Sequence, residues 1–318
     1  MDRDRNPQAA WPVANSAVVV GLSYFVREPP AELWNDPLRG RIARYAWGPD
    51  YHEVMLPMLK ELAESAAAAV GGAVMYRTCV DSSPIFERDL AEQAGLGFIG
   101  RNTNLISPGL GSFVFLGEIL VDRGIDFRSS IGDLRLEDNC GRDTKIANPK
   151  SQIENACGSC RRCVDACPTN AFPEPFVLDA SRCISYLTIE NRGSIPEELR
   201  PRMRNWIFGC DECQEACPWV VRFSKPGRKR FLKFDPDTCA PELTELIAMT
   251  ERDFRERFAG TPVLRAKRRG LQRNVAIALG NSGNAGVLPS LEKAAGDAEP
   301  LVREHAAWAI GQLRAGRG

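Results

Sequence analysis

The spacing of the cysteines constrains this chain more than any other feature. A run of four cysteines has gaps of two, two and three residues, a later run of three has gaps of two and three, and a proline follows each run. Together with one cysteine between the runs, the set comprises Cys157, Cys160, Cys163, Cys167, Cys183, Cys210, Cys213 and Cys217. Three thiolates two residues apart on a tight loop can reach three irons of one cube, whereas the fourth points away. The pattern therefore predicts two 4Fe–4S clusters.

This spacing is that of bacterial ferredoxins, in which the last cysteine of each run ligates the other cluster. The same crossover assigns Cys157, Cys160, Cys163 and Cys217 to a first cluster, and Cys167, Cys183, Cys210 and Cys213 to a second. Structural zinc is the alternative, because it also uses Cys-x-x-Cys pairs. Zinc sites rarely show three cysteines at two-residue gaps followed by Cys-Pro. The remaining Cys79, Cys140 and Cys239 are expected to be buried or incidental thiols.

The bulk properties fit a protein that lies outside the membrane. Lys and Arg together number 41, as do Asp and Glu, so the net charge predicts no acidic partner. The longest apolar stretches, such as residues 17–25, are too short to span a bilayer. The N-terminus has no apolar segment of a secretory signal. We therefore expect a cytoplasmic chain, where disulfides are rare and eleven cysteines favour metal binding.

Three regions are predicted along the chain. Residues 1–130 alternate strands, at 17–22, 72–77 and 112–120, with helices at 51–70 and from Ser83 to Gly95, with Pro84 as the first helical residue, which indicates an α/β layer fold. Residues 131–222 hold the cysteine runs and begin with a polar stretch, 131–156, that reads as a loop or insertion. Residues 223–318 are helical, and segments 271–280 and 301–311 echo each other, as in a HEAT-like helix-pair repeat.

Several motifs outside the cysteine runs are similar to those of the epoxyqueuosine reductase family. They are Asp50-Tyr51-His52, the segment 80–88 (Val-Asp-Ser-Ser-Pro-Ile-Phe-Glu-Arg), the tract 94–103 (Ala-Gly-Leu-Gly-Phe-Ile-Gly-Arg-Asn-Thr), the segment 183–190, Gly209-Cys210-Asp211, Cys217-Pro218-Trp219 and the segment 271–281. The resemblance runs from about Val18 to the end of the chain. This sequence is shorter than the family ahead of the first strand and longer in the 131–156 stretch.

The resemblance implies a fold and a function. The fold is an α/β cobalamin-binding core, nitroreductase-like and shared with reductive dehalogenases, with a two-cluster ferredoxin-like module and a C-terminal HEAT-like domain that binds tRNA. The implied reaction reduces epoxyqueuosine to queuosine in a tRNA anticodon of the GUN type. The cofactors are two 4Fe–4S clusters and cobalamin, an external donor supplies electrons, and a monomer is expected. The alternatives are a cobalamin-dependent reductase of a small molecule, such as an organohalide, and a non-catalytic ferredoxin-type electron carrier.

The resemblance also implies roles for particular residues. Asp81 would be the general acid that protonates the opened epoxide, although an Asp ahead of Ser-Ser-Pro is also typical of a helix cap. Gly97, Gly100, Arg101, Asn102 and Thr103 would lie near the cobalamin, with the glycines permitting close backbone approach. His52 either ligates cobalt, binds a phosphate, or is an ordinary surface or hydrogen-bonded histidine of a helix, and no axial role is predicted for it.

Two basic runs suggest contact with RNA, although such runs are usually solvated faces. The run expected to bind tRNA comprises Arg265, Lys267, Arg268, Arg269 and Arg273. The other comprises Arg222, Lys225, Arg228, Lys229, Arg230 and Lys233.

Overall fold

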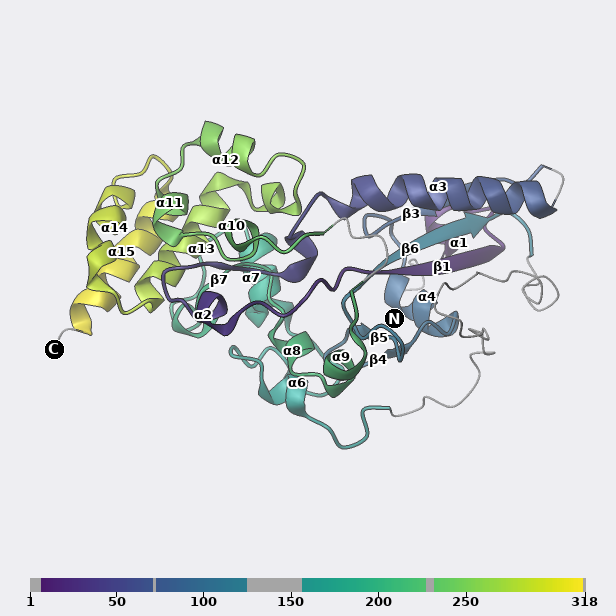
Figure 1. Cartoon of the computed structure of the whole chain (residues 1–318), viewed down its shortest axis with the longest axis horizontal. Helices are drawn as coiled ribbons and strands as arrows, with labels where there is room; N and C mark the ends of the chain where they lie inside the picture. Colours follow the sequence, from purple (N-terminus) through teal and green to yellow (C-terminus); the bar gives the residue numbers. More distant parts are fainter. Residues whose placement is uncertain (1–6, 71–72, 125–155, 227–231, 317–318) are drawn as a thin grey trace.

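The computed structural model describes residues 7–70, 73–124, 156–226 and 232–316. A sheet with the long helix α3 (Tyr51–Val70) lies at one end of an elongated molecule, and a group of helices ending in α15 (Pro300–Ala315) lies at the other (Figure 1). Three short helices that follow or contain cluster cysteines, α6 (Arg162–Asp165), α8 (Glu212–Glu215) and α9 (Pro218–Phe223), lie between and below them. The polar stretch 131–155, Cys140 and the basic residues 228–230 lie outside the described residues.

The main sheet has three antiparallel strands in the order β1 (Ser16–Ser23), β6 (Val114–Val121) and β3 (Tyr76–Cys79). These elements confirm the strands predicted near 17–22, 72–77 and 112–120. Side chains alternate along β6, as the period of a strand requires. Ile119 faces Met55 and Leu59 of α3, whereas Leu120 belongs to a separate apolar cluster on the opposite face. The sheet is therefore covered on both sides, as predicted for an α/β layer.

Helix α4 (Glu87–Gln93) packs against the face of the sheet opposite α3, but it begins later than predicted. The expected first residue, Pro84, lies in a bend, and Phe86 precedes the helix without a side-chain cap. The prediction was wrong because a proline after Ser-Ser is also compatible with a turn. In place of the predicted first helical turn, residues 80–86 form a loop that carries Asp81.

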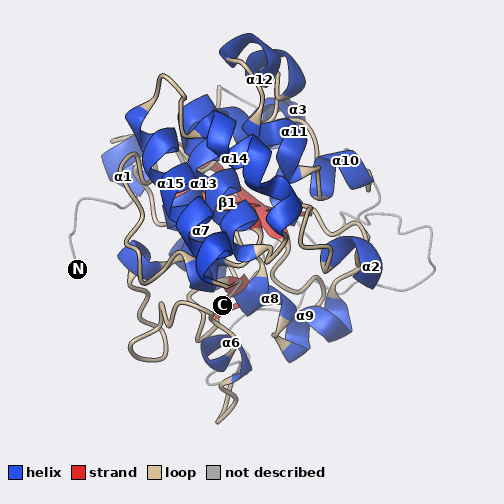
Figure 2. Ribbon diagram, turned by 90° about the vertical axis from the view of Figure 1, so that its left-hand side faces the viewer, coloured by secondary structure: helices blue, strands red, loops and turns tan. Residues whose placement is uncertain are grey.

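The C-terminal part is a stack of helices around α13 (Lys267–Asn281). This helix is buried on every side from Gly270 to Gly280 and packs against α15 and α11 (Leu243–Ile247). Figures 1 and 2 both show α13, α14 (Leu288–Ala294) and α15 side by side. A Cβ at Gly280 would lie 2.9 Å from the backbone of Ala309, so this glycine lets α13 and α15 approach closely. The pairing confirms the helical repeat predicted from segments 271–280 and 301–311.

One hydrophobic core joins all three predicted regions. It contains residues 34–47 of the first, 184–208 of the second and 239–313 of the third. Within it, β2 (Arg41–Ile42) pairs in parallel with β7 (Trp206–Phe208), next to α2 (Ala31–Trp34) and α7 (Ile184–Ile189). The C-terminal helices are therefore not an appendage, because removing them would expose the core of the other two regions.

Short elements complete the described chain. They are α1 (Pro7–Ala10), η2 (Arg44–Ala46), β4 (Phe98–Ile99), β5 (Leu105–Ile106), η3 (Ala180–Arg182), η4 (Pro201–Met203), α10 (Pro236–Cys239), α12 (Glu251–Arg257), η5 (Pro262–Ala266) and η6 (Ala285–Val287). Within the described ranges, no helix has the length and apolar character needed to cross a lipid bilayer.

Candidate active site and cluster ligands

The two cysteine runs fold alike and pack against each other. Each run places one cysteine inside a short helix, Cys163 in α6 and Cys213 in α8, and these helices are in contact. Each run ends at a Cys-Pro step. Proline has no backbone N–H, so it is well suited to begin a new segment. Cys163, Cys167 and Cys213 share a small apolar cluster with Phe172. The similar spacing of the runs thus produces two facing loops rather than one.

The four cysteines predicted for the first cluster are brought together. Burial, followed by the neighbouring charges of Cys217, Cys157 and Cys160, raises the pKa of the Cys163 thiol to about 11. Cys217 comes from the second run and stands at the N-terminus of α9. Its approach to the first run is the crossover that the spacing predicted.

The four cysteines predicted for the second cluster also lie together. Burial and the charges of Cys183, Cys163 and Cys167 raise the pKa of Cys213, and burial and Cys213 raise that of Cys210. Amide donors face these sulfurs, as is usual around iron–sulfur clusters. The backbone N–H of Ala171 lies 3.3 Å from the Cys167 sulfur.

The thiols are grouped without converging on one point. Among the described residues, no group of three or more His, Cys, Asp or Glu side chains converges on a single point as the ligands of one metal ion do. The donor set, eight thiols in two groups of four with amide donors, fits two iron–sulfur cubes. Of the other cysteines, Cys79 and Cys239 are buried in apolar clusters, which matches the expectation for them.

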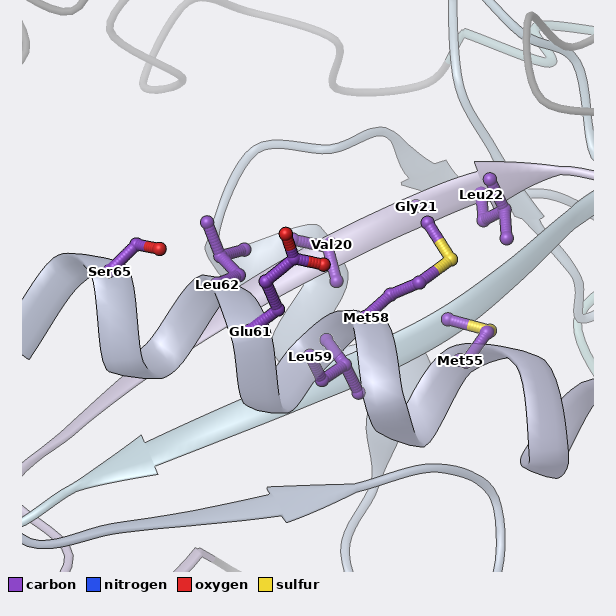
Figure 3. A pocket seen from close by; sticks show the side chains of 9 residues that line it. All are labelled: Val20, Gly21, Leu22, Met55, Met58, Leu59, Glu61, Leu62 and Ser65. Atoms are coloured by element: carbon purple, nitrogen blue, oxygen red, sulfur yellow. The ribbon is translucent and has the colours of Figure 1, made fainter.

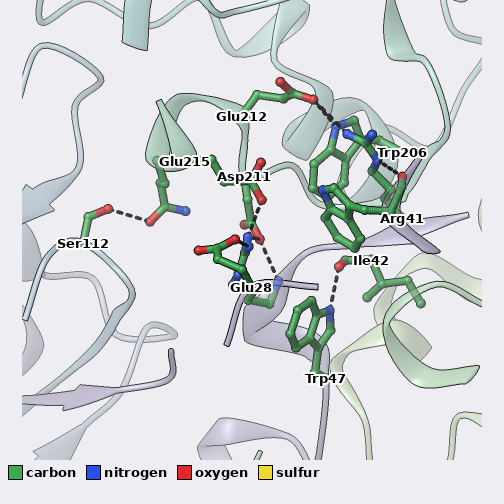
Figure 4. A network of polar contacts seen from close by, with 12 residues as sticks. Glu28, Arg41, Ile42, Trp47, Ser112, Trp206, Asp211, Glu212 and Glu215 are labelled. Carbon is green, nitrogen blue, oxygen red and sulfur yellow. Dashed lines mark hydrogen bonds and ion pairs between the residues drawn. The ribbon is translucent and has the colours of Figure 1, made fainter. Parts of the chain in front are cut away.

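A buried arginine anchors the second cluster loop. Arg44 is fully buried, and its guanidinium and backbone N–H both donate to Asp211, the residue after Cys210, at 3.1 and 2.9 Å. Figure 4 shows Asp211 and Glu28 within this polar network. Arg44 also pairs with Glu215 and Glu28. Burial lowers the pKa of Arg44, but the charges of Asp211, Glu215 and Glu28 outweigh burial and leave that pKa raised. Sequence reasoning missed Arg44, because a single arginine far from the cysteines carries no signal.

A cavity of about 660 Å³ adjoins the second cluster loop. Asn104 lines it and places its amide nitrogen 3.9 Å from the sulfur of Cys213. Aromatic and aliphatic side chains from β6, from the start of α3 and from Tyr24, which follows β1, form much of the wall, together with Asp81. The lining includes Tyr24, Tyr45, Tyr51, Ile99, Thr103, Leu105, Ser112, Phe115, Leu116, Phe176 and Gln214. The cavity thus combines aromatic and aliphatic walls with the carboxyls of Asp81, Glu87 and Asp89, and Asn104 links it to the cluster ligand Cys213.

Asp81 is presented to this cavity by a strained loop. Its φ of 51° lies in the left-handed region, which is uncommon for a residue with a side chain. Its carboxylate accepts a hydrogen bond of 2.6 Å from the Tyr51 hydroxyl and lies 3.9 Å from His52 and 4.0 Å from Arg265. No side chain caps α4, so the capping alternative for Asp81 is wrong. The sequence presents Tyr51 only as part of the Asp50-Tyr51-His52 motif and does not predict its contact with Asp81.

The residues expected near cobalamin are distributed differently from the prediction. Only Thr103 lines the cavity. Arg101 donates to the carbonyl of Gly158 in the first cysteine run, and Asn102 donates to the carbonyl of Cys213 at 3.2 Å. These two side chains therefore hold the cluster loops.

The glycines of the same tract serve the protein's own packing. A Cβ at Gly97 would lie 2.2 Å from the carbonyl oxygen of Ile106, and one at Gly100 would lie 2.4 Å from the Ile106 side chain. What approaches these glycines closely is thus β5. That a cofactor also approaches these glycines stays a prediction.

The basic run of the helical part divides into exposed and structural arginines. Arg273 is fully buried and donates to the carbonyls of Leu187, Asn191 and Gly193 at 2.6–2.7 Å. Arg268 forms a two-bond ion pair with Asp297, at 2.9 Å for each bond. Predicting these two arginines as tRNA contacts was wrong, because their donors are already satisfied inside the fold.

Three residues of that run remain accessible. Lys267 is exposed and Arg269 half-buried, and the side chain of Arg265 is 54% exposed. In the other basic run, Arg222, Lys225 and Lys233 are exposed.

A second cavity, of about 520 Å³, lies between α3 and β1 (Figure 3). Its lining is mostly apolar, from Met55, Met58, Leu59 and Leu62 of α3 and from residues 20–22 of β1. Glu61 is the one ionisable residue among its lining residues. The chemistry-bearing side chains of the described chain thus gather at the first cavity.

Comparisons with known proteins agree with this geometry. Residues 156–220 match the family described as "4Fe-4S double cluster binding domain", residues 261–317 match "HEAT repeats", and residues 5–82 match "Epoxyqueuosine reductase QueG, DUF1730". An epoxyqueuosine reductase from Xanthomonas campestris pv. campestris is 40% identical over 315 residues, which cover 98% of this chain and 82% of the relative.

Two solved structures are similar in fold. An epoxyqueuosine reductase with an epoxyqueuosine-modified tRNA-Tyr stem loop has a TM-score of 0.80 and 30% identity, covering 98% of this chain and 77% of the other. A Bacillus subtilis epoxyqueuosine reductase with its catalytic aspartate loop swung out of the active site also has a TM-score of 0.80 and 30% identity, covering 96% and 76%. The chain therefore belongs to the epoxyqueuosine reductase family.

Proposed function

We propose that this protein reduces epoxyqueuosine to queuosine in the anticodon of tRNA, the last step in making that base. The observation that carries the proposal is the position of Asp81 in a cavity whose wall, at Asn104, reaches the second cluster loop. The reaction consumes two electrons and two protons, converts the epoxide to a carbon–carbon double bond and releases its oxygen as water. A proton donor beside an electron-delivering centre is what this stoichiometry needs.

The cavity is proposed to hold cobalamin and the eight cysteines two 4Fe–4S clusters. When bound, the clusters supply electrons and the corrinoid supplies a reactive cobalt. Thr103, Asn104, Ser112 and Gln214 offer polar contacts around the cavity, while Phe115 and Leu116 offer apolar ones. Asn102 and Arg101 support the cluster loops behind it.

Asp81 is proposed to be the general acid. In its protonated form it gives one proton to the oxygen of the opened epoxide, and the second of the two protons consumed lets that oxygen leave as water. The Tyr51 hydroxyl and the Arg265 guanidinium stabilise the carboxylate that remains. Proton delivery by a positioned acid typically contributes about a hundredfold to ten-thousandfold in rate.

The substrate is proposed to lie across the helical part and the cavity mouth. Arg265, Lys267 and Arg269 are the accessible cations of the predicted run, and phosphate contacts of this kind position RNA without reading its sequence. The modified base would leave the anticodon stack to enter the cavity. We further propose tRNAs with GUN anticodons, an external electron donor, and a cytoplasmic monomer with regions 1–130, 131–222 and 223–318.

A small-molecule reductase is the second candidate, and the contact between Arg265 and Asp81 argues against it. A reductase of small molecules needs no cation from the helical part at its acid. Deleting the C-terminal helices would not separate the two candidates, because they complete the shared core. Substitution of the accessible cations is the sharper test.

The deciding experiment is mass spectrometry of nucleosides from epoxyqueuosine-containing tRNA. The tRNA is incubated without oxygen with the reconstituted protein, cobalamin and a strong reductant. Appearance of queuosine establishes the reaction. Unchanged epoxyqueuosine, with clusters and corrinoid both loaded, would exclude it and favour a small-molecule substrate, whereas clusters without bound corrinoid would favour an electron carrier.

A further inference from the structure

A carboxyl group is buried in the centre of the main sheet. Glu118 lies on the middle strand β6, between Val19 of β1 and Cys79 of β3, and is fully buried. Neither of its carboxyl oxygens meets an N–H or O–H donor among the described residues. Burying an unpaired carboxylate is costly, so a role for this group has to be sought in what it faces.

The group that faces Glu118 is another carboxyl, that of Glu87 at the start of α4. Two ionised carboxylates only accept hydrogen bonds, so this contact is a hydrogen bond only when one of them carries a proton. Burial, followed by the charge of Glu87, raises the pKa of Glu118 to about 9. Glu118 therefore holds the proton at neutral pH and donates it to Glu87.

Among the described residues, the groups whose charges act on Glu118 are the carboxyls of Glu87 and Asp81. The thiol of Cys79 on β3 faces the pair, and burial raises its pKa as well, which keeps it neutral. Arg77 on the same strand donates to the carbonyl of Ala10. The other charged groups whose fields reach Glu87 are Asp81 and His52.

Glu87 connects this pair to the loop of Asp81. Its oxygen Oε1 accepts a hydrogen bond from the backbone N–H of Asp81. That N–H belongs to the residue whose φ of 51° is strained, so the bond stabilises a conformation that the backbone alone disfavours. The order of contacts is therefore Glu118 to Glu87, and Glu87 to the Asp81 backbone.

We propose that Glu118 and Glu87 form a carboxyl–carboxylate latch that holds the Asp81 loop in the cavity, an inference that rests on the proposed role of Asp81 as the acid. Glu118 acts through Glu87 and is a positioning residue. With its proton in place it fixes Glu87, and Glu87 fixes Asp81. Without that proton, two carboxylates repel each other and the loop is released. The swung-out catalytic loop of the Bacillus subtilis relative shows that such a loop can take two positions in this family.

The test uses two variants of the full-length, reconstituted protein. Glu118→Gln keeps the shape and a permanent N–H donor toward Glu87, whereas Glu118→Leu keeps the volume and removes the donor. Ile119→Ala, on the same strand but facing α3, is the control for general loss of sheet stability. The first readout is amide hydrogen exchange of the loop 80–86 relative to α13, followed in short pulses between pH 7 and 10. The second is kcat and KM on the modified tRNA stem loop.

In the wild type, protection of the loop relative to α13 should fall as the pH rises through about 9. Glu118→Gln should keep the protection and kcat of the wild type at pH 7 and lose that pH dependence. Glu118→Leu should lower loop protection and kcat about tenfold at pH 7, as expected for one buried hydrogen bond, with KM unchanged, and its loop protection should show no further fall toward pH 10. Ile119→Ala should leave the ratio of loop to α13 protection unaltered.

Two results would overturn the latch. One is equal protection of the loop from exchange in Glu118→Leu and the wild type at pH 7, and the other is wild-type loop protection that does not change with pH. The exchange readout does not depend on turnover. A wild type that makes no queuosine but shows the predicted loop behaviour would refute the proposed function and retain the latch as a device of the fold. A wild type that makes queuosine but shows none of the predicted loop behaviour would refute the latch alone.

Discussion

The guanidinium of Arg265 lies 4.0 Å from the carboxylate of Asp81, although the two residues belong to opposite ends of the chain. Arg265 stands in η5, just ahead of α13, and its Nε bonds to Glu190 at 2.6 Å. Its backbone carbonyl accepts a hydrogen bond of 2.7 Å from Arg192. The part of the molecule proposed to hold RNA thus reaches the proposed acid directly.

Replacing Arg265 should therefore impair the reaction more than the fold. We expect Arg265→Ala to lower kcat/KM on the stem loop by up to about fivefold, since an exposed ion pair such as the 4.0 Å contact with Asp81 contributes about 0.2–1 kcal/mol. Arg255→Ala, which removes an exposed arginine of α12 paired only with Glu251, is the matched control. Equal kcat/KM values for the two variants would contradict a role for Arg265 at the site.

Asp81→Asn should leave the fold intact and stop proton delivery. We expect kcat in single turnover to fall by about a hundredfold or more, the usual contribution of a general acid. Asp89→Asn changes another carboxylate that lines the same cavity and should retain activity. Tyr51→Phe removes only the hydrogen bond of 2.6 Å to Asp81 and should cost less than Asp81→Asn. A fully active Asp81→Asn would remove Asp81 from the mechanism.

Arg44 should matter for stability and for the second cluster together. Arg44→Met leaves Asp211 buried without its charge partner, and breaking such a buried pair costs about 3–5 kcal/mol of unfolding free energy. Because Asp211 lies between Cys210 and Cys213, iron content should fall as well. Arg39→Met, whose ion pairs lie nearer the surface, should cost about 1 kcal/mol or less. Anaerobic thermal melting with iron analysis checks both.

Much of this arrangement could be predicted from the sequence, and the failures have physical causes. Cysteine spacing predicted both ligand groups, because short loops leave few ways to surround a cube. The glycine-rich tract predicted close approach of a cofactor, whereas the structure shows that β5 approaches Gly97. A run of arginines cannot show which members are buried. Arg44 and Glu118 depend on long-range packing, which a single sequence does not display.

The raised pKa of Glu118 also predicts how stability depends on pH. A group that binds its proton more tightly in the folded state stabilises the fold at lower pH, and this stabilisation is lost as the pH rises through the folded pKa. Burial places that pKa at about 9. The melting temperature of the wild type should therefore decline more steeply than that of Glu118→Gln between about pH 5 and pH 9, and the two slopes should converge above about pH 9. Parallel pH profiles for the two proteins would show that Glu118 does not carry the proton.

Because only some residues of the basic run are accessible, we predict how the affinity for RNA depends on salt concentration. Each lost phosphate contact should reduce the slope of log Kd against log salt concentration by about 0.7–0.9. Lys267→Ala and Arg269→Ala should each show such a reduction, since both side chains are accessible. Arg273→Met should leave the slope unchanged and destabilise the protein, because its guanidinium holds three backbone carbonyls inside the fold. The measurement is stem-loop binding by fluorescence anisotropy at several salt concentrations. A shallower slope for Arg273→Met alone would mean that the buried arginine becomes exposed when RNA binds, and it would reverse the assignment made from the structure.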